Sequence, residues 1–325
     1  MWILARRRLF DAAIVVWLVG TLSFALLHLA PSDPIAAAMT DPRVAPSVRA
    51  HWRAAYALDQ PLIEQYARYV AALARGDLGY SFSQFRPVAD ALREALPYSF
   101  LLMGTALVAS VIIGAAIGAW QAMRAGKPMD RTLSVVTSGL GAIPEVWLAL
   151  MLLTVLGAEF AIFPLSGRCD PVLCGTSNGW RATIDGVYHL VLPALTLTLL
   201  FSAVFARVQR VALHAVLHDE ITRRTRAKGV SERRLLTHHT LRRAARPLAT
   251  TVGLSLPALV GGSVFIERVF GWPGMGSLLV SAIGVRDYPL VTATAMIGSL
   301  LVLLGSLLTD GVAALLDPRW TNAST

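Results

Sequence analysis

The chain has 325 residues, of which 55% are hydrophobic and 15% are charged, with a formal net charge of +9. A chain this apolar is not an ordinary soluble protein, and its two cysteines exclude a disulfide scaffold or a four-cysteine metal site. The positive charge lies in loops beside long apolar runs, which is typical of a membrane protein rather than of a nucleic-acid-binding surface.

The first predicted element is a membrane span at residues 1–30. Three arginines, Arg6–Arg8, precede an apolar run from Phe10 to Ala30 that is long enough to cross roughly 30 Å of hydrocarbon. A cleaved signal peptide is the alternative interpretation. We favour a retained span, because the run is longer than the apolar part of a signal peptide and because further spans follow.

Residues 31–97 form a polar region in which arginines and acids balance. After Pro61, apolar and aromatic residues recur at helical spacing until Gly76 ends the pattern. This predicts a periplasmic insertion with at least one amphipathic helix. A packing cap on the outer face is favoured over a substrate pocket.

The remainder, residues 98–319, is predicted to be a core of five spans. Span two carries small residues one turn apart, Ser110, Gly114 and Gly118, which predicts a face for close helix packing. Span three contains Pro144-Glu145 near its middle. The predicted boundaries are 98–123 for span two, 132–157 for span three, 188–206 for span four, 248–265 for span five and about 290–316 for span six, with a Gly/Pro-rich loop at 270–289.

The loops between spans alternate in charge. The N-terminus, residues 124–131 and residues 207–246 are positive, whereas the loop at 158–187 is slightly acidic. The positive-inside rule therefore places both termini and the basic loops in the cytoplasm of a bacterial cell, in a multi-pass protein of the inner membrane. The acidic loop then faces the oxidising periplasm, where Cys169 and Cys174 can form a disulfide; two free thiols remain the alternative.

The segment 207–246 is the most basic part of the chain, with eleven Lys/Arg against three acids. We call it the basic loop. Its sequence predicts a helix, a break at Gly229 and a second helix that begins with Ser231 as N-cap and Glu232 in its first turn. A pair of short helices between spans, on the charged side, is a docking surface for a cytoplasmic partner.

The stretch Arg226-Ala-Lys-Gly-Val-Ser-Glu232 resembles the cytoplasmic coupling loop of ABC importer permeases, and more narrowly that of the dipeptide/oligopeptide/nickel family. Other signatures of this family occur in the same order over nearly the whole chain: Leu58-Asp-Gln-Pro61, Gly76-Asp-Leu-Gly79, Phe270-Gly-Trp-Pro-Gly-Met-Gly276, Arg286-Asp-Tyr-Pro289 and Asp317-Pro-Arg319. The Glu-Ala-Ala triplet of the broader superfamily falls on Arg223-Arg224-Thr225 here, a glutamate that the peptide branch also usually lacks.

The resemblance implies an all-α integral membrane protein of six transmembrane helices, with a coupling-helix pair between helices four and five. It implies the permease subunit of an ATP-driven importer of peptides, nickel or metal chelates. The implied partners are a second homologous permease, two ATP-binding cassette subunits that hold ATP and Mg²⁺, a periplasmic solute-binding protein and the lipid bilayer, but no nucleic acid. The expected docking residues are Ala227, Lys228, Gly229, Ser231, Glu232 and Arg233.

Glu145 is a candidate residue of the translocation path. A carboxylate near the centre of an apolar span costs at least about 2.5 kcal/mol if it faces lipid, so it is expected to face the bundle interior or a water-filled cavity. There it would favour a cationic group, such as a metal complex or a peptide amino terminus. A glutamate that only holds two spans together is the alternative.

No catalytic or metal-binding pattern occurs in the sequence. The chain has no phosphate-binding Gly-x-x-x-x-Gly-Lys loop, no His-Glu-x-x-His and no Cys-x-x-Cys. We therefore predict that it is not an enzyme and holds no metal or cofactor. An ion-coupled secondary transporter is one alternative, but only Glu145 and Asp310 are acids within apolar segments and no internal repeat is evident. A non-transporting membrane assembly subunit is another, and it leaves the helix-Gly-helix pattern unexplained.

Overall fold

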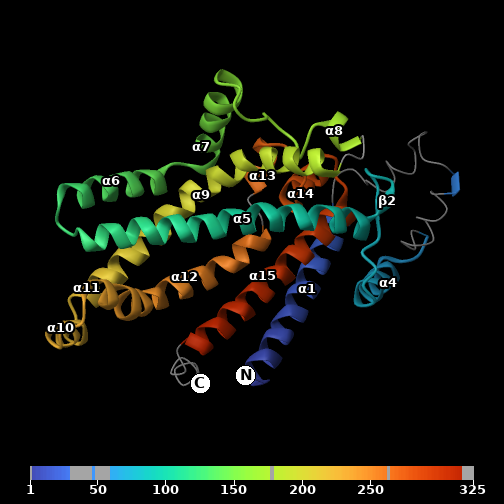
Figure 1. Cartoon of the computed structure of the whole chain (residues 1–325). Coiled ribbons are helices and arrows are strands. Elements are labelled where there is room, and N and C mark those ends of the chain that lie inside the picture. Colours follow the sequence, from blue (N-terminus) through green and yellow to red (C-terminus); the bar gives the residue numbers. More distant parts are fainter. Residues whose placement is uncertain (1, 30–45, 48–58, 176–178, 262–263, 317–325) are drawn as a thin grey trace.

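The computed structural model describes residues 2–29, 46–47, 59–175, 179–261 and 264–316 (Figure 1). Within these ranges the regular secondary structure is helical, as predicted, except for one small β-hairpin. The elements are α1 (Trp2–Leu29), α4 (Leu62–Ala74), β1 (Tyr80–Ser81), β2 (Arg86–Pro87), α5 (Val88–Met123), α6 (Pro128–Ala142), α7 (Glu145–Leu152), the π-helix η1 (Leu153–Glu159), α8 (Pro171–Gly175), α9 (Gly179–Leu217), α10 (Glu220–Ala227), α11 (Glu232–Arg234), the π-helix η2 (Leu235–Thr240), α12 (Leu241–Gly261), α13 (Val264–Val269), α14 (Met275–Gly284) and α15 (Tyr288–Leu316). The motif at 317–319 and most of the region 31–58 lie outside the described residues.

The two longest helices, α5 and α9, lie side by side and run parallel to each other (Figure 1). Their contact confirms the small-residue face predicted on span two. A Cβ atom on Gly114 would lie 2.7 Å from the Ser202 carbonyl oxygen, and one on Gly118 would lie 2.3 Å from that of Ala206. The glycines therefore let the two backbones meet directly, as small residues do between membrane helices.

The other helices pack around this pair. The start of α6 lies against α9, α12 contacts α9 and α5, and α15 lies against α12, with α1 on its far side (Figure 1). A buried apolar cluster joins α5 and α9 to α7, α13 and the glycine-rich segment through Leu102, Leu192, Ile266 and Trp272. The indole of Trp272 donates a hydrogen bond to the Tyr98 carbonyl, 2.9 Å away, so this aromatic side chain is both buried and satisfied.

Three helices in the described part of the chain are long and apolar enough to cross a membrane, namely α5, α9 and the Tyr288–Leu307 part of α15. The pair formed by α6 and α7–η1 counts as a fourth if it is one broken span. The apolar stretch of α1, Ala13–Ala25, is shorter than in these helices. The predicted count of six spans therefore remains a prediction.

Several helices extend beyond the ranges predicted for the spans or lie within a predicted loop. The helix of span two begins at Val88 rather than residue 98, since Pro97 is accommodated inside α5. The helix of span four begins at Gly179 and continues to Leu217, eleven residues into the basic loop. The segment 270–289 is not only a loop, because it contains α14.

The third predicted span is not one straight helix. α6 and the α7–η1 segment meet at an angle of 101° across Ile143-Pro144. Ile143 has extended backbone angles (φ −74°, ψ 131°), as residues before proline prefer, and Pro144 has no N–H to continue the helical hydrogen bonds. The proline therefore ends α6 and starts α7, and the depth inferred for Glu145 from a straight helix does not apply.

The approach of α5 to α9 makes a testable prediction. Gly118→Ala should lower the unfolding temperature of the purified protein, because a methyl group placed 2.3 Å from the Ala206 oxygen forces the helices apart at a cost of about 1–3 kcal/mol. Gly104→Ala is the matched control on the same helix, since no atom lies within 4 Å of its added Cβ. An equal response of the two variants would contradict close packing at Gly118.

Candidate functional site

The basic loop has the predicted helix-turn-helix form. α10 ends at Ala227, and Lys228 is its C-cap. Gly229 follows with φ +81°, in the left-handed region that favours glycine, so the break falls where it was predicted. Ser231 occupies the N-cap position of α11, although its side chain makes no capping hydrogen bond. All six residues predicted to dock are exposed: Ala227, Lys228, Gly229, Ser231, Glu232 and Arg233.

Asp219 fixes the start of α10 to the rest of the protein. Its Oδ1 accepts a hydrogen bond from the Thr222 N–H at 2.7 Å, which makes it the N-cap, and its Oδ2 pairs with the guanidinium of Arg243 on α12. The Thr222 hydroxyl, which is buried, donates to the Val216 carbonyl at 2.7 Å. One carboxylate thus ties α10 to α12, while Thr222 ties α10 to the end of α9. The sequence analysis missed Asp219, although Asp before a helix is a recognisable cap signal.

A second ion pair closes the turn itself. The guanidinium of Arg226 donates to both carboxylate oxygens of Glu232, with Nη2 at 3.2 Å from Oε2. Hydrogen bonding from Arg226 lowers the pKa of the Glu232 carboxyl. Both side chains are largely exposed, so the pair itself contributes little to stability. The glycine conformation and the Asp219 cap are therefore the stronger constraints on the shape of the turn.

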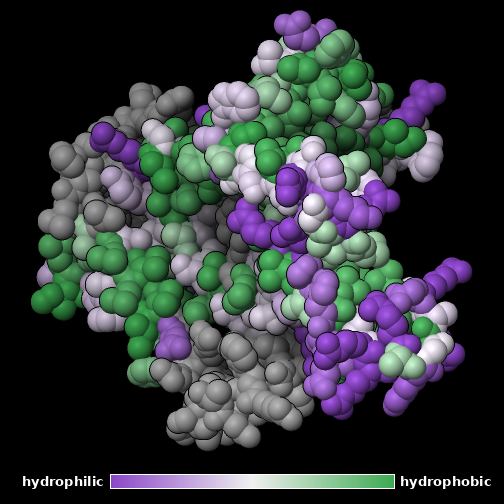
Figure 2. Space-filling model, turned by 90° about the vertical axis from the view of Figure 1, so that its left-hand side faces the viewer, coloured by the Kyte–Doolittle hydropathy of each residue, from purple (hydrophilic) through white to green (hydrophobic). Residues whose placement is uncertain are grey.

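The outer face of the basic loop combines cations with one large apolar side chain. Ile221 is 61% exposed on an otherwise polar helix. Arg223, Arg224 and Lys228 lie exposed around it. Figure 2 views the molecule from the end that carries α10, and hydrophilic side chains gather in one part of this face beside apolar ones. The surface suits a partner with an acidic rim and an apolar pocket.

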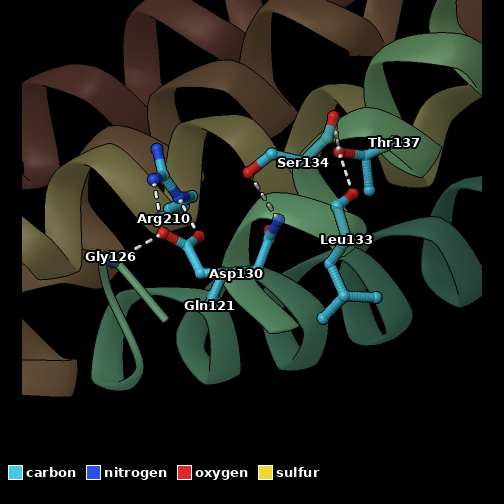
Figure 3. A network of polar contacts seen from close by, with 7 residues as sticks. All are labelled: Gln121, Gly126, Asp130, Leu133, Ser134, Thr137 and Arg210. Carbon is cyan, nitrogen blue, oxygen red and sulfur yellow. Dashed lines mark hydrogen bonds and ion pairs between the residues drawn. The ribbon is translucent and has the colours of Figure 1, made fainter. Parts of the chain in front are cut away.

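An ion pair between a buried carboxylate and a partly exposed guanidinium joins α9 to the start of α6 (Figure 3). The Arg210 guanidinium donates two hydrogen bonds to Asp130, with Nε–Oδ1 2.7 Å and Nη2–Oδ2 2.9 Å. Asp130 is only 2% exposed and also accepts the Gly126 N–H at 3.0 Å. Gln121 of α5 donates to Ser134 of α6 at 3.2 Å. The network therefore holds the α5–α6 turn against the helix that leads into the basic loop, and the sequence analysis did not identify it.

Glu145 is the first residue of α7, immediately after the 101° bend, and it is half-buried. It thus lies at the corner between two helices rather than within a continuous one. A helix N-terminus stabilises a negative charge, so this place accommodates a carboxylate better than the middle of a helix does. The structure does not bring Glu145 together with the basic loop.

Cys169, two residues before α8, and Cys174, within α8, are joined by a disulfide, with Cα atoms 6.4 Å apart. The segment that leads into α8 is fixed to the glycine-rich motif, because the Gly167 N–H donates to the Phe270 carbonyl at 2.9 Å. Arg168 lies over the Tyr98 ring, with the guanidinium carbon 5.1 Å from its centroid. The bridged loop is therefore attached to α5 and to the segment before α14.

Two acids explain the motifs that the sequence analysis left without a role. Glu267, fully buried, accepts hydrogen bonds from Ser99 at 2.6 Å and from the backbone N–H groups of Gly276 and Ser277 at 2.7 and 3.0 Å. A Cβ atom on Gly274 would lie 2.3 Å from its Oε1. The glycines of Phe270–Gly276 thus make room for a carboxylate that caps α14.

Asp287 has the corresponding role for α15. Its Oδ2 accepts the Ser83 N–H at 2.9 Å and the Ser83 hydroxyl at 2.7 Å, and it also pairs with the Ser81 hydroxyl. Its Oδ1 faces the Leu290 N–H in the first turn of the helix. Asp287 therefore anchors the β1–β2 hairpin to α15. The described residues contain no group of three or more His, Cys, Asp or Glu side chains able to hold a metal ion.

Two family descriptions match the chain. Residues 110–322 match "Binding-protein-dependent transport system inner membrane component", and residues 1–103 match the description of the N-terminal part of such components. Among individual proteins, the oligopeptide transport system permease protein AppB of Bacillus subtilis is 34% identical over 316 residues, which is 97% of each chain.

Two further relatives are equally similar. The glutathione transport system permease protein GsiC of Escherichia coli K12 is 34% identical over 316 residues, 96% of each chain. The di/tripeptide transport system permease protein DppB of Pseudomonas aeruginosa is 34% identical over 313 residues, 93% of each chain. The likeness thus extends over nearly the whole length of both partners.

The Asp219 cap makes a prediction about pH. Hydrogen bonding from Arg243 lowers the pKa of the Asp219 carboxyl from about 3.8 to about 2. Because the pKa is lower in the folded protein, its stabilisation of α10 is complete above pH 4 and is lost as the pH falls from about 4 to about 2. Asp219→Asn should make the amides of α10 exchange roughly tenfold faster at pH 7, and this difference from the wild type should shrink below pH 4.

Hydrogen–deuterium exchange, corrected for the intrinsic pH dependence of exchange, measures this difference. Glu220→Gln is the matched control, because the Glu220–Arg224 pair is exposed on the same helix and contributes little. A pH-independent effect of Asp219→Asn would show that the charge of Asp219 does not hold α10.

Proposed function

The chain belongs to the family of binding-protein-dependent transport system inner membrane components, and we propose that it carries peptides across the bacterial inner membrane as one permease subunit of an ABC importer. The relatives are transport permeases and not enzymes, and ATP hydrolysis in such importers lies in separate subunits. The names of the relatives, which refer to oligopeptides, di/tripeptides and glutathione, favour peptides over nickel or metal chelates as the cargo.

The observation that carries this function is the shape of the basic loop. α10 presents Ile221 and exposed arginines outward, while Asp219 and Thr222 fix its inner side to α12 and α9. A helix held in this way moves together with the helices that hold it. Movement of an ATPase bound to its outer face would therefore be transmitted to α9 and α12 as a rigid-body displacement.

The ion pair between Asp130 and Arg210 extends this connection to the broken span. α9 carries Arg210 seven residues before its last residue, and α6 carries Asp130 in its first turn. A displacement of the end of α9 therefore moves the start of α6, which leads to the corner where Glu145 lies. These links from α10 toward the corner at Glu145 support a physical route for alternating access.

The remaining subunits follow from this role. A second homologous permease, two ATP-binding cassette subunits that hold ATP and Mg²⁺, and a periplasmic solute-binding protein complete the importer. In the membrane, α1, α5, α6 with α7–η1, α9, α12 and α15 form the six spans, and both termini lie in the cytoplasm with the basic loop. The bridged Cys169–Cys174 loop then faces the periplasm, where the disulfide is stable.

Gly229→Val should uncouple ATP hydrolysis from transport while the protein stays in the membrane. The φ of +81° is costly for a β-branched residue, so the turn between α10 and α11 should change shape. The measurement is peptide uptake and ATPase activity of the complete complex in proteoliposomes; uptake should fall at least tenfold with hydrolysis retained.

Gly76→Val is the matched control for this test, because Gly76 has φ +79° at the end of α4 and, like Gly229, no atom within 4 Å of an added Cβ. It introduces the same backbone strain far from the basic loop and should leave coupling unchanged. Normal uptake by Gly229→Val would refute the coupling role.

Glu145→Gln should remove a preference for a cationic substrate group. If the carboxylate attracts a peptide amino terminus, the wild-type complex takes up a free peptide better than its N-acetylated form. The ratio of the two uptake rates should be about tenfold smaller in the variant. Glu159→Gln, a change of an exposed acid at the end of η1, is the control. An unchanged ratio at normal expression would leave Glu145 with a structural role.

A further inference from the structure

Two cavities adjoin along the contact between α1 and α15. The larger, of about 550 Å³, is lined by apolar and small residues that include Val15, Leu279, Gly298 and Val302. The smaller, of about 330 Å³, is lined by Ser23, Ile283, Arg286, Tyr288, Val291 and Thr292. Val291 of α15 lines the smaller cavity, and Ala295 and Gly298, at helical spacing on the same face, line the larger. The two cavities therefore follow one another along α15, and we call them together the groove.

The groove is polar at one end and apolar at the other. Arg286 is the one charged residue among those described as lining it, and it lies with Ser23, Tyr288 and Thr292 at the end where α15 begins. The distance along α1 from Ser23 to Val15 is about 12 Å, and the distance along α15 from Thr292 to Val302 is about 15 Å. These lengths match half of a bilayer's hydrocarbon thickness, roughly 15 Å.

Aromatic residues mark the polar end as a membrane–water interface. Phe24 of α1 packs against Tyr66 and Tyr69 of α4, with ring centroids 5.3 and 5.6 Å apart, and the Thr21 hydroxyl hydrogen-bonds to the Tyr66 hydroxyl at 2.7 Å. Tyr288 lines the groove at this end. Tyrosines gather where the headgroups of a bilayer begin, which places the apolar cavity within the hydrocarbon.

The backbone of Arg286 provides an independent reason to look for a ligand. Its φ is +57°, in the left-handed region, at the end of α14. The Arg286 N–H donates to the Ile283 carbonyl at 3.1 Å, and the Asp287 N–H donates to the Ala282 carbonyl at 2.9 Å. Glycine is the usual residue at a helix end with these hydrogen bonds. An arginine in this conformation is strained relative to glycine, which favours a role for its side chain.

We propose that this groove binds one phospholipid with an anionic headgroup, from the leaflet opposite the coupling helices. The guanidinium of Arg286 would bind the phosphate and the hydroxyls of Ser23, Tyr288 and Thr292 would lie beside it, while one acyl chain fills the cavity at Gly298. Charge complementarity selects an anionic lipid, and the match of groove length to half a bilayer selects a lipid over a soluble anion. The site rests on the proposed membrane location of the chain and not on its transport activity.

The test is native mass spectrometry of the full chain, with the subunits that co-purify, titrated with phosphatidylglycerol or phosphatidylcholine. Arg286→Gly removes the charge and relieves the backbone strain, so it should raise the unfolding temperature and still weaken phosphatidylglycerol binding about tenfold, the loss expected for one charge-assisted hydrogen bond. Phosphatidylcholine binding should change little. Arg181→Gln, an exposed arginine near the start of α9, should have no effect.

Gly298→Leu tests the apolar end. No atom lies within 4 Å of an added Cβ at Gly298, so the side chain should enter the cavity without a clash and displace the acyl chain, reducing the binding of both lipids. Gly104→Leu, which also points into open space on a predicted span, is the control. Wild-type lipid binding by both Arg286→Gly and Gly298→Leu would overturn the proposal. Loss of the second permease from Gly298→Leu with lipid retained would instead assign the groove to that subunit.

Because lipid binding is measured without substrate or ATP, its outcome is separate from the outcome of the transport experiments. A complex that transports peptides but shows no difference between the two lipids overturns only the lipid site. A chain that binds phosphatidylglycerol selectively but transports nothing overturns only the proposed function.

Discussion

The direct contact of α5 with α9 is the constraint on which the rest of the fold depends. Gly114 and Gly118 bring the two backbones together, and this fixes where Arg210 on α9 can meet Asp130 at the start of α6. It also fixes the end of α9, from which Asp219 starts α10. The helix pair α10–α11 is thus positioned by glycines that contact α9 at Ser202, Ala206 and Arg210, before α9 ends at Leu217. This is expected in a membrane protein, where close van der Waals packing replaces the hydrophobic effect between helices.

Local signals in the sequence were sufficient for much of this arrangement. Gly229 was predicted as the break in the basic loop because it lies between two helical patterns, and its φ of +81° agrees with that prediction. Gly118 was predicted as a packing residue because of its spacing from Gly114. The long apolar runs predicted helices correctly. Their ends were harder to place, because helices such as α9 continue into polar sequence when neighbouring helices pack against that extension.

Interactions distant in the sequence could not be predicted. The Asp130–Arg210 pair joins residues 80 positions apart, and Ser99 binds Glu267 across 168 positions. No pattern in one sequence indicates which acid meets which donor. The bend at Pro144 was partly foreseeable, since proline ends a helix, but the angle depends on how α7 packs against α9 and α13.

The buried carboxylate of Glu267 has a consequence for how this part of the chain can change during evolution. All three atoms nearest to an added Cβ on Gly274 belong to the Glu267 carboxyl group, whereas a Cβ on Gly276 also meets the backbone of Val264 at 2.6 Å. Positions 267 and 274 are therefore coupled, so a shorter residue at 267 would release 274 from being glycine. Position 276 has no such freedom, because a main-chain atom cannot be substituted away.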